Sequence, residues 1–232
     1  MANIFTRTEI IIGKDNQQKI RSKKIAVFGL GGVGTYALEG LIRAGIEHID
    51  IFDKDVVDIT NINRQLIATM DTIGKDKVEV AKTRILSINP SVDVKTYKIF
   101  YDESNSNKYP LNEYDYVVDA IDSVKSKIEL IKNAKDSNTE IISCMGTGNK
   151  IDPSLLKIED ISKTSMCPLA KVIRKELKNL GIKKLKVLYS TEEPSDPYMG
   201  DDGVVQGSIS FVPSVAGLMI SGEIIRDIIN KD

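Results

Sequence analysis

The segment AVFGLGGVG, residues 26–34, has the composition of a phosphate-binding turn. Gly29, Gly31 and Gly34 occupy the positions of a GxGxxG motif between a β-rich run and a helical run. Glycines at this spacing allow a tight turn and let backbone N–H groups approach a phosphate, and the start of the following helix adds partial positive charge. Gly32 is an additional glycine that widens the space for phosphate oxygens. The motif alone is weakly specific, so the residues after it decide which ligand it serves.

Two carboxylates follow at the end of the next predicted strand. Asp53 lies about 20 residues after Gly34, which is the spacing expected of a carboxylate that binds ribose hydroxyls. Asp55 either contacts ribose in the same way or is a solvated turn residue. This context strengthens the interpretation of the glycine turn as part of a nucleotide site.

A polar cluster, TNINRQ at residues 60–65, has no evident use in a hydride-transfer enzyme. Arg64 offers a guanidinium fork suited to phosphate, and Lys77 adds a second cation at the start of the next predicted helix. Asp122 ends the fourth predicted strand, at the edge where open α/β sheets bind ligands. Two cations, a glycine turn and a carboxylate fit a triphosphate with Mg²⁺ better than a dinucleotide. The candidate nucleotide-binding residues of the cluster are Asn61, Asn63, Arg64 and Gln65.

Hydrophobic periodicity predicts the elements that must position these side chains. Strands are predicted at residues 25–28, 49–52, 92–97, 116–118 and 140–144, and helices at residues 35–44, 76–88 and 124–134. Strands that alternate with helices indicate βαβ units. The sequence therefore predicts an α/β fold, Rossmann-like and doubly wound, with a mainly parallel sheet.

The second half of the chain is less regular. We expect one domain over residues 1–232, with a nucleotide-binding core at about 22–146, a loop-rich substrate region with long crossover loops at about 147–208, and a C-terminal extension of one strand and one helix at 209–230. A basic amphipathic helix is predicted at 171–186 inside the substrate region. Its basic residues form either a nucleic-acid surface or a solvated face, and they are Lys171, Arg174, Lys175, Lys178, Lys183, Lys184 and Lys186.

The composition limits partners and location. The chain has 232 residues with 32 basic and 33 acidic side chains, so net charge supplies no attraction to a nucleic acid and a local patch is required. Two cysteines, Cys144 and Cys167, without a signal peptide favour a reducing cytoplasm and exclude a four-cysteine zinc site. The apolar run at 209–222 is shorter than the roughly 20 residues that a membrane span needs.

The motifs resemble a known superfamily. GLGGVG, DKD, NINRQ, GKDK and DAIDS stand in the order and at the spacing of the ubiquitin-activating-enzyme superfamily, which includes the adenylating enzymes of molybdopterin and thiamin biosynthesis. Four later segments, KIDPSLLKIEDISKT, CPLAKVIRKELK, STEEP and SFVPSVAGLMISGEIIRDII, are similar to one branch, the tRNA threonylcarbamoyladenosine dehydratases. The resemblance covers essentially the whole chain.

This resemblance implies a homodimer that binds ATP and Mg²⁺ and acts on tRNA. Arg64, Lys77 and Asp122 are the implied catalytic residues, and Asp122 is the implied metal ligand. Arg7 matches an arginine that reaches into the partner subunit's site in related enzymes, although it is equally an ordinary surface residue. The residues implied to contact the nucleotide are Gly32, Asp53, Asn61, Arg64, Lys77, Asp122 and Ser123.

The implied reaction is the ATP-dependent dehydration, or cyclisation, of threonylcarbamoyladenosine next to the tRNA anticodon. Transfer of AMP activates the carboxylate, and the ureido group of the same base then closes a ring, helped by its tethered position. Ile67 stands where related dehydratases often have histidine, so proton transfer must use a carboxylate, a phosphate or water.

Three other classes stay open from the residues. One is adenylation of the C-terminus of a ubiquitin-like sulfur carrier, for which Cys167 in a predicted loop is the candidate thiol, otherwise a spectator. A cysteine desulfurase or a sulfur-acceptor system would be a partner if the chain had this sulfur-carrier function. The others are an NAD-dependent oxidoreductase, weakened by TNINRQ, and a nucleotide-binding regulator without catalysis.

Overall fold

The apolar runs at residues 25–28 and 116–118 form the centre of a sheet. β1 (Lys24–Phe28) is buried except at its first residue, and every residue of β4 (Tyr116–Asp119) is buried. Strands buried on both faces are typical of parallel sheets that helices cover on both sides. The structure, a computed structural model, describes residues 3–195, 198–200 and 203–230.

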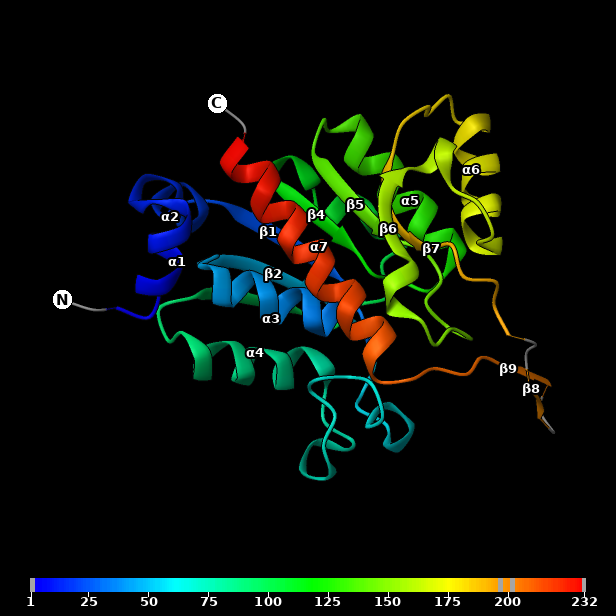
Figure 1. Ribbon diagram of the computed structural model, residues 1–232, viewed down its shortest axis with the longest axis horizontal. Coiled ribbons are helices and arrows are strands. Elements are labelled where there is room, and N and C mark those ends of the chain that lie inside the picture. Colours follow the sequence, from blue (N-terminus) through cyan, green and yellow to red (C-terminus); the bar gives the residue numbers. More distant parts are fainter. Residues whose placement is uncertain (1–2, 196–197, 201–202, 231–232) are drawn as a thin grey trace.

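Strands on both sides of this centre complete the sheet. They are β2 (His48–Phe52), β3 (Asp93–Tyr97), β5 (Glu140–Cys144), β6 (Leu156–Asp160) and β7 (Lys186–Ser190). Within the described residues, seven strands pair in the order β3-β2-β1-β4-β5-β7-β6 (Figure 1). All neighbours are parallel except β6 and β7, which are antiparallel. The predicted strands of the core and the mainly parallel sheet are therefore confirmed.

Helices cover both faces of the sheet. On one face lie α3 (Gly34–Ala44), α4 (Lys77–Ile88) and α7 (Phe211–Asn230), whose buried apolar residues share one core cluster, with α2 (Lys14–Arg21) beside α7. On the other lie α5 (Val124–Asp136) and α6 (Pro168–Asn179), which share a second cluster. The short α1 (Thr6–Ile12) precedes α2 at the end of the molecule where the N-terminus lies (Figure 1). The fold is doubly wound, as predicted.

Short elements join the strands. A two-stranded sheet of β8 (Tyr198–Gly200) and β9 (Gly203–Val205) lies apart from the main sheet, and an extended segment connects it to the start of α7 (Figure 1). The 3₁₀ turns are Ile59–Asn61, Met70–Thr72, Ser106–Lys108, Leu111–Glu113, Pro153–Leu155 and Ile161–Lys163. Among the described residues, no helix combines the length and the apolar character that crossing a membrane requires.

The prediction of a C-terminal strand is wrong. Residues 209–230 contain one helix, α7, and no strand in the described part of the segment. Pro213 lies in the first turn of that helix, where a missing N–H costs no hydrogen bond. Val212, Ala216, Ile220 and Ile224 recur at helical spacing and are buried, so the apolar run is one face of a helix.

Two further expectations for the second half fail. The region at 147–208 is not only loops, because β6 and β7 extend the main sheet. The basic helix also does not reach residue 186: α6 ends at Asn179, and Gly181 follows with φ 74°. Lys183 and Lys184 therefore lie in the connection to β7 and not on the helix. The division of the chain into core and substrate regions stays a prediction.

Candidate functional site

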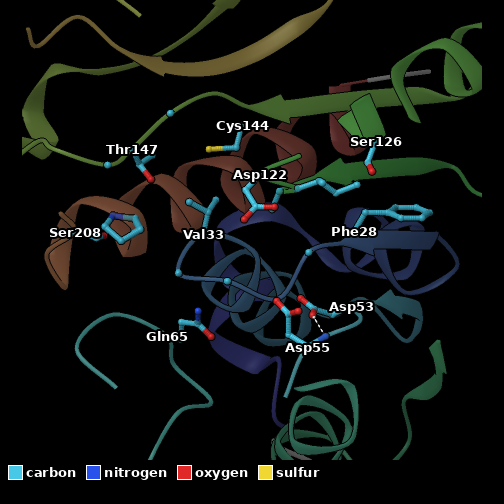
Figure 2. A pocket seen from close by; sticks show the side chains of 18 of the residues that line it. Phe28, Val33, Asp53, Asp55, Gln65, Asp122, Ser126, Cys144, Thr147 and Ser208 are labelled. Carbon is cyan, nitrogen blue, oxygen red and sulfur yellow. Dashed lines mark hydrogen bonds between the residues drawn. The ribbon is translucent and has the colours of Figure 1, made fainter. Parts of the chain in front are cut away.

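A cavity of about 510 Å³ lies at the carboxyl edge of the sheet, where β1, β2, β4 and β5 end. The chain leaves β1 toward β2 on one side, whereas β4 lies on the other side of β1. Ligands of open α/β sheets bind at such a switch point. Figure 2 shows side chains from all four strand ends directed into this space.

The glycine turn serves two purposes that the structure separates. A side chain at Gly29, which has φ 91°, would lie 2.5 Å from the carbonyl oxygen of Ala120, and one at Gly34 would collide with the carbonyl oxygen of Gly29. These two glycines are required by packing. Gly31 faces open space, Gly32 lies against Pro213 and Arg64, and both line the cavity. The backbone just before α3 therefore borders the cavity, where an anionic group can approach its amides.

Asp53 braces the glycine turn from the end of β2. Its Oδ2 accepts from the Leu30 N–H at 2.6 Å, and its Oδ1 accepts from the Asp55 N–H at 2.8 Å. Burial raises the pKa of Asp53 against the opposing attraction of Lys77. Asp53 and Asp55 both line the cavity and lie close together in Figure 2. Each Asp53 oxygen retains a lone pair that ribose hydroxyls can use.

Lys77 is a buried cation in the cavity wall. Its side chain is 7% exposed, and its Nζ lies 3.3 Å from Oδ2 of Asp55, whose side chain is 51% exposed. The first turn of a helix disfavours a positive charge, so a carboxylate partner or an anionic ligand is needed at this position. The placement supports the expectation that Lys77 faces phosphate.

The structure divides the TNINRQ cluster into two groups. Arg64 and Gln65 line the cavity, and Asn61 and Asn63 do not. Asn61 closes a capping box with Asp58, accepting from the Asp58 N–H at 3.1 Å. Asn61 therefore has a structural role in the turn through its Oδ1, and its contact with the nucleotide stays a prediction.

Asn63 connects two parts of the site. Its Oδ1 accepts from Nη1 of Arg64 at 2.9 Å, and its Nδ2 donates to the carbonyl oxygen of Ser208 at 2.9 Å. Arg64 Nη1 also donates to the Thr60 carbonyl oxygen at 2.9 Å. These bonds fix one edge of the guanidinium, and no hydrogen bond among the described residues uses Nη2, which leaves a donor for phosphate.

Gln65 carries a polar atom without a partner. Its side chain is 6% exposed, and no group of the described residues bonds its Oε1. Figure 2 shows Gln65 at the edge of the cavity, across from the strand ends of β4 and β5. An unpaired buried oxygen is unfavourable, so a ligand that supplies a donor would complete the site.

The end of β4 places Asp122 on the rim of the cavity. Asp119 accepts from the Ile121 N–H at 3.2 Å, which fixes the backbone that carries Asp122. Ser123 is the N-cap of α5, where its hydroxyl accepts from the Ser126 N–H at 3.5 Å, and it does not line the cavity. The predicted nucleotide contact of Ser123 is not seen among the lining residues.

A buried ion pair below the cavity was not predicted from the sequence. Nζ of Lys127 lies 2.9 Å from Oδ2 of Asp119, and both side chains are fully buried. Lys127 also donates to the Cys144 carbonyl oxygen at 2.9 Å and to the Ser143 hydroxyl at 3.3 Å. The pair joins the carboxyl ends of β4 and β5. The available signal was a lysine on the apolar face of the predicted helix.

Neither cysteine is exposed. Cys144 lines the cavity, and burial raises its pKa to about 12. Cys167, predicted to lie open in a loop, is 6% exposed at the N-cap of α6. This correction has a packing reason: the thiol belongs to the core cluster between α6 and the sheet.

Arg7 does not reach the cavity of its own chain. It is exposed on α1, and the neighbouring Phe5 packs near Gly45, at the far end of α3 from the glycine turn. A role for Arg7 at a nucleotide site would require a second chain.

The basic segment also divides. Lys171, Lys175 and Lys178 are exposed on α6, and Lys183 and Lys184 are exposed beyond it. Arg174 instead donates through Nη1 to the Thr164 hydroxyl at 2.7 Å and to the carbonyl oxygens of Thr164 and Ile161, which makes it a brace for the preceding loop.

Among the described residues, no group of three or more histidine, cysteine or acidic side chains is arranged to hold a metal. Mg²⁺ in nucleotide sites is held by one or two carboxylates together with phosphate oxygens and water. Asp122 lines the cavity and carries carboxylate oxygens, and its role as a metal ligand stays a prediction. Ile67, which stands in place of a histidine, is 3% exposed and is a core residue.

Comparisons with known proteins agree with this geometry. Residues 5–232 match the ThiF family. The tRNA threonylcarbamoyladenosine dehydratase of Bacillus subtilis (strain 168) is 40% identical over 243 residues, covering 99% of this chain and 96% of that protein. The enzyme of the same name from Escherichia coli (strain K12) is 38% identical over 75% of this chain and 65% of its own length.

Solved structures show the same relationship. The crystal structure of E. coli tRNA N6-threonylcarbamoyladenosine dehydratase, TcdA, in complex with ATP matches with a TM-score of 0.90 at 33% identity, covering 97% of this chain and 93% of that one. The complex of TcdA with AMP matches with a TM-score of 0.89. The resemblance drawn from the motifs is confirmed. The chain belongs to the ThiF family and, within it, to the tRNA threonylcarbamoyladenosine dehydratases.

Proposed function

We propose that this chain catalyses the ATP-dependent dehydration of threonylcarbamoyladenosine next to the anticodon of tRNA, by adenylating the carboxylate of that base. One observation carries the proposal: a single cavity brings together the glycine turn, Arg64, Lys77 and Asp122. This set matches the charge of a nucleoside triphosphate. The related dehydratases match over nearly the whole chain.

The residues that line the cavity have different roles in the first step, the adenylation of the substrate. The carboxylate oxygen of the substrate attacks the α-phosphorus of ATP, pyrophosphate leaves, and a mixed anhydride with AMP forms. Arg64 and Lys77 stabilise charge on the phosphoryl oxygens, and the amides at Gly31 and Gly32 bind phosphate. Asp53 accepts from ribose hydroxyls. Asp122 would hold Mg²⁺, which supplies further charge neutralisation to the phosphates when bound.

The second step closes the ring. The ureido group attacks the activated carbonyl carbon, AMP leaves, and the ureido proton is lost, so the base loses one water overall. Cys144 does not accept this proton, because its raised pKa keeps the thiol protonated. Ile67 offers no base. The proton therefore goes to the departing phosphate, a carboxylate or water, and tethering of the nucleophile supplies much of the rate.

The alternative, adenylation of a ubiquitin-like sulfur carrier, is not favoured. Its candidate acceptor Cys167 is buried in the core between α6 and the sheet. If turnover depended on a small protein that ends in Gly-Gly, this alternative would be supported. A cysteine desulfurase would then be the expected sulfur donor.

We propose a homodimer as the working form. Arg7 lies at the opposite end of α3 from its own cavity, and Ile4, Ile10 and Ile11 beside it are 66%, 79% and 84% exposed. Large apolar side chains grouped on a surface favour an interface. A sedimentation experiment that gives the mass of one chain would contradict the dimer. We further propose that the protein acts in the cytoplasm, where its tRNA substrate is found.

The exposed lysines of α6 are the proposed tRNA surface. Leu169, at the start of the helix, lines the cavity, and Lys171, Lys175 and Lys178 are exposed farther along the same helix. Replacing these three by alanine should lower the salt dependence of tRNA binding by about one unit of slope per lost phosphate contact. ATP affinity should not change. Equal salt slopes for the variant and the parent would remove this surface from the proposal.

The test of the function is direct. The purified protein is incubated with ATP, Mg²⁺ and tRNA that carries threonylcarbamoyladenosine, and the nucleosides are analysed by mass spectrometry. We expect the modified base to lose one water only when ATP is present. An unchanged base with intact ATP binding would overturn the proposed reaction.

A further inference from the structure

Two buried polar atoms that lack partners belong to residues lining the cavity. They are Oε1 of Gln65 and Oγ of Ser126, and no group of the described residues bonds either one. Figure 2 places the two side chains at opposite ends of the cavity, with Asp53 and Asp122 between them. Gln65 lies beside Arg64, at the end already assigned to phosphate. Ser126 lies at the other end, which the proposed chemistry leaves without a role.

Ser126 is fixed in place but unsatisfied. It is 1% exposed in the first turn of α5, and both Ser126 and Asp122, which lies just before the N-cap Ser123, line the cavity. Its N–H is bonded to the Ser123 hydroxyl, whereas its own hydroxyl has no partner in the described residues. A buried hydroxyl without a hydrogen bond destabilises the free protein. A bound molecule with a polar edge would remove that penalty.

The surroundings of Ser126 favour a flat apolar group. Phe28 lies near Ser126 at the same end of the cavity, and its ring stacks on Phe52 at 4.1 Å and contacts Tyr101 edge-on at 4.9 Å. Aromatic walls with one polar group at the edge suit a heterocyclic base, which is apolar on its faces and polar at its rim. This end also lies beyond Asp53, on the side away from Gln65, where a base attached to the bound ribose would extend.

We propose that the Ser126 hydroxyl forms a hydrogen bond with the nucleobase of ATP, at the edge that carries N1, the 6-amino group and N7. The inference rests on the proposed function, because it assumes that ATP is the ligand. A hydroxyl can donate to a ring nitrogen or accept from the amino group, so both kinds of atom on that edge are suitable.

The experiment is a thermodynamic cycle that combines one change in the protein with one change in the nucleotide. Wild type and Ser126→Ala are titrated calorimetrically, in the presence of Mg²⁺, with ATP and with analogues that lack N1, the 6-amino group or N7. Removing one neutral hydrogen bond should weaken ATP binding by about 3- to 10-fold. For the analogue that lacks the partner atom, the ratio between the two proteins should fall to about 1.

The variant should fold, because it removes an unpaired buried hydroxyl and leaves a methyl group against an aromatic wall. We expect its unfolding midpoint without nucleotide to equal or exceed that of wild type. Ser87→Ala, which removes an exposed hydroxyl of α4, is the matched control and should bind ATP like wild type.

The outcomes are separable. If wild type fails to bind ATP, the proposed function is overturned. If ATP binds wild type and Ser126→Ala equally, or if the ratio stays the same for all three analogues, the base contact is overturned while the proposed function stands. A ratio that falls to about 1 for one analogue supports the inference and identifies the atom.

Discussion

The two halves of the cavity are built by different kinds of contact. On the nucleotide side, which holds the glycine turn and residues 53–65, several bonds that shape the turns are local: Asp53 accepts from the Asp55 N–H two residues away, and Asp58 and Asn61 close a capping box. The other side is formed by residues 146–149 and 206–208, and we call it the substrate side because we propose that it faces the tRNA base. There the bonds join distant segments, such as the one from the Gly207 N–H to Oδ1 of Asn149, 58 residues apart. Local bonds leave a motif in the sequence, and distant ones do not.

Asn149 holds the substrate side together. It adopts φ 57°, donates its N–H to the Gly207 carbonyl oxygen at 2.8 Å, and accepts from the Gly207 N–H at 2.6 Å. Its carbonyl oxygen accepts from the Ser195 N–H at 2.9 Å. Asn63 then ties Ser208 to Arg64, so the two halves meet at one asparagine. Variants on each side should therefore affect different measured quantities.

The largest effect is expected below the nucleotide side. Lys127→Met leaves Asp119 buried and unpaired, which should lower the free energy of unfolding by about 3–5 kcal/mol. Urea unfolding followed by circular dichroism measures the change. Lys125→Met, at an exposed lysine on the same helix, should stay within about 0.5 kcal/mol of the parent. Equal stability of the two variants would show that the pair does not hold the ends of β4 and β5.

Arg64→Ala should separate chemistry from stability. Loss of a preorganised charge at the phosphates should reduce turnover by about 100- to 1,000-fold. The unfolding free energy should change little, because Arg64 is partly exposed and bonds mainly its own turn. Arg43→Ala, which removes an exposed arginine paired with Glu39, is the control for a lost guanidinium. Full turnover in Arg64→Ala would contradict the assigned role.

Asn149→Gly should affect the other half. Glycine keeps the positive φ but loses the acceptor for the Gly207 N–H, so the mouth of the cavity loosens. We expect KM for the modified tRNA to rise about 3- to 10-fold while ATP affinity stays unchanged. Asn149→Ala, which adds backbone strain, should have the larger effect. If ATP affinity falls as much as tRNA affinity, the two halves are not independent.

The sequence predicted the nucleotide side well because its signals are short-range. The glycine turn, the carboxylate at the end of β2 and the helix periods all lie within a few tens of residues, and the helix face of Leu38, Leu41 and Ile42 is buried as its spacing predicts. Asn61 and Ser123 were selected by motif, and in the structure both side chains take part in caps, while their contacts with the nucleotide stay predictions. Residue type alone does not distinguish a polar group that caps a turn from one that faces a ligand.

The substrate side was harder for a physical reason. β6 and β7 are recognisable only as partners of each other and of β5, since β6 is a partly exposed edge strand. Lys127 shows the same limit of sequence-based prediction within the core. A lysine on a helix is expected to be exposed, and its burial is explained only by its partners Asp119, Ser143 and the Cys144 carbonyl oxygen. The position of these strands and the burial of Lys127 depend on pairing between groups that are distant in the sequence, so no single segment predicts them.

The smallest effect concerns an ionic link outside the cavity, where β7 meets α7. Nζ of Lys186 lies 2.8 Å from Oε1 of Glu223 and 2.6 Å from Oδ2 of Asp227. Burial opposes ionisation of Glu223, but its bonds to Lys186 and Arg226 outweigh that cost and hold its pKa below the usual 4.5. A lowered folded-state pKa means stability that is fully present above pH 4.5 and is lost as pH falls through the folded value.

Glu223→Gln removes that titration. The decrease in unfolding free energy between pH 7 and about pH 3 should therefore be smaller in the variant than in the parent, by at most about 1 kcal/mol, since the link is partly exposed. Glu103→Gln, at an exposed glutamate, should titrate like the parent. If Glu223→Gln shows the parent's full acid sensitivity, the link contributes nothing to the acid dependence of stability, and the contacts between α3 and α7 must hold α7 in place without it.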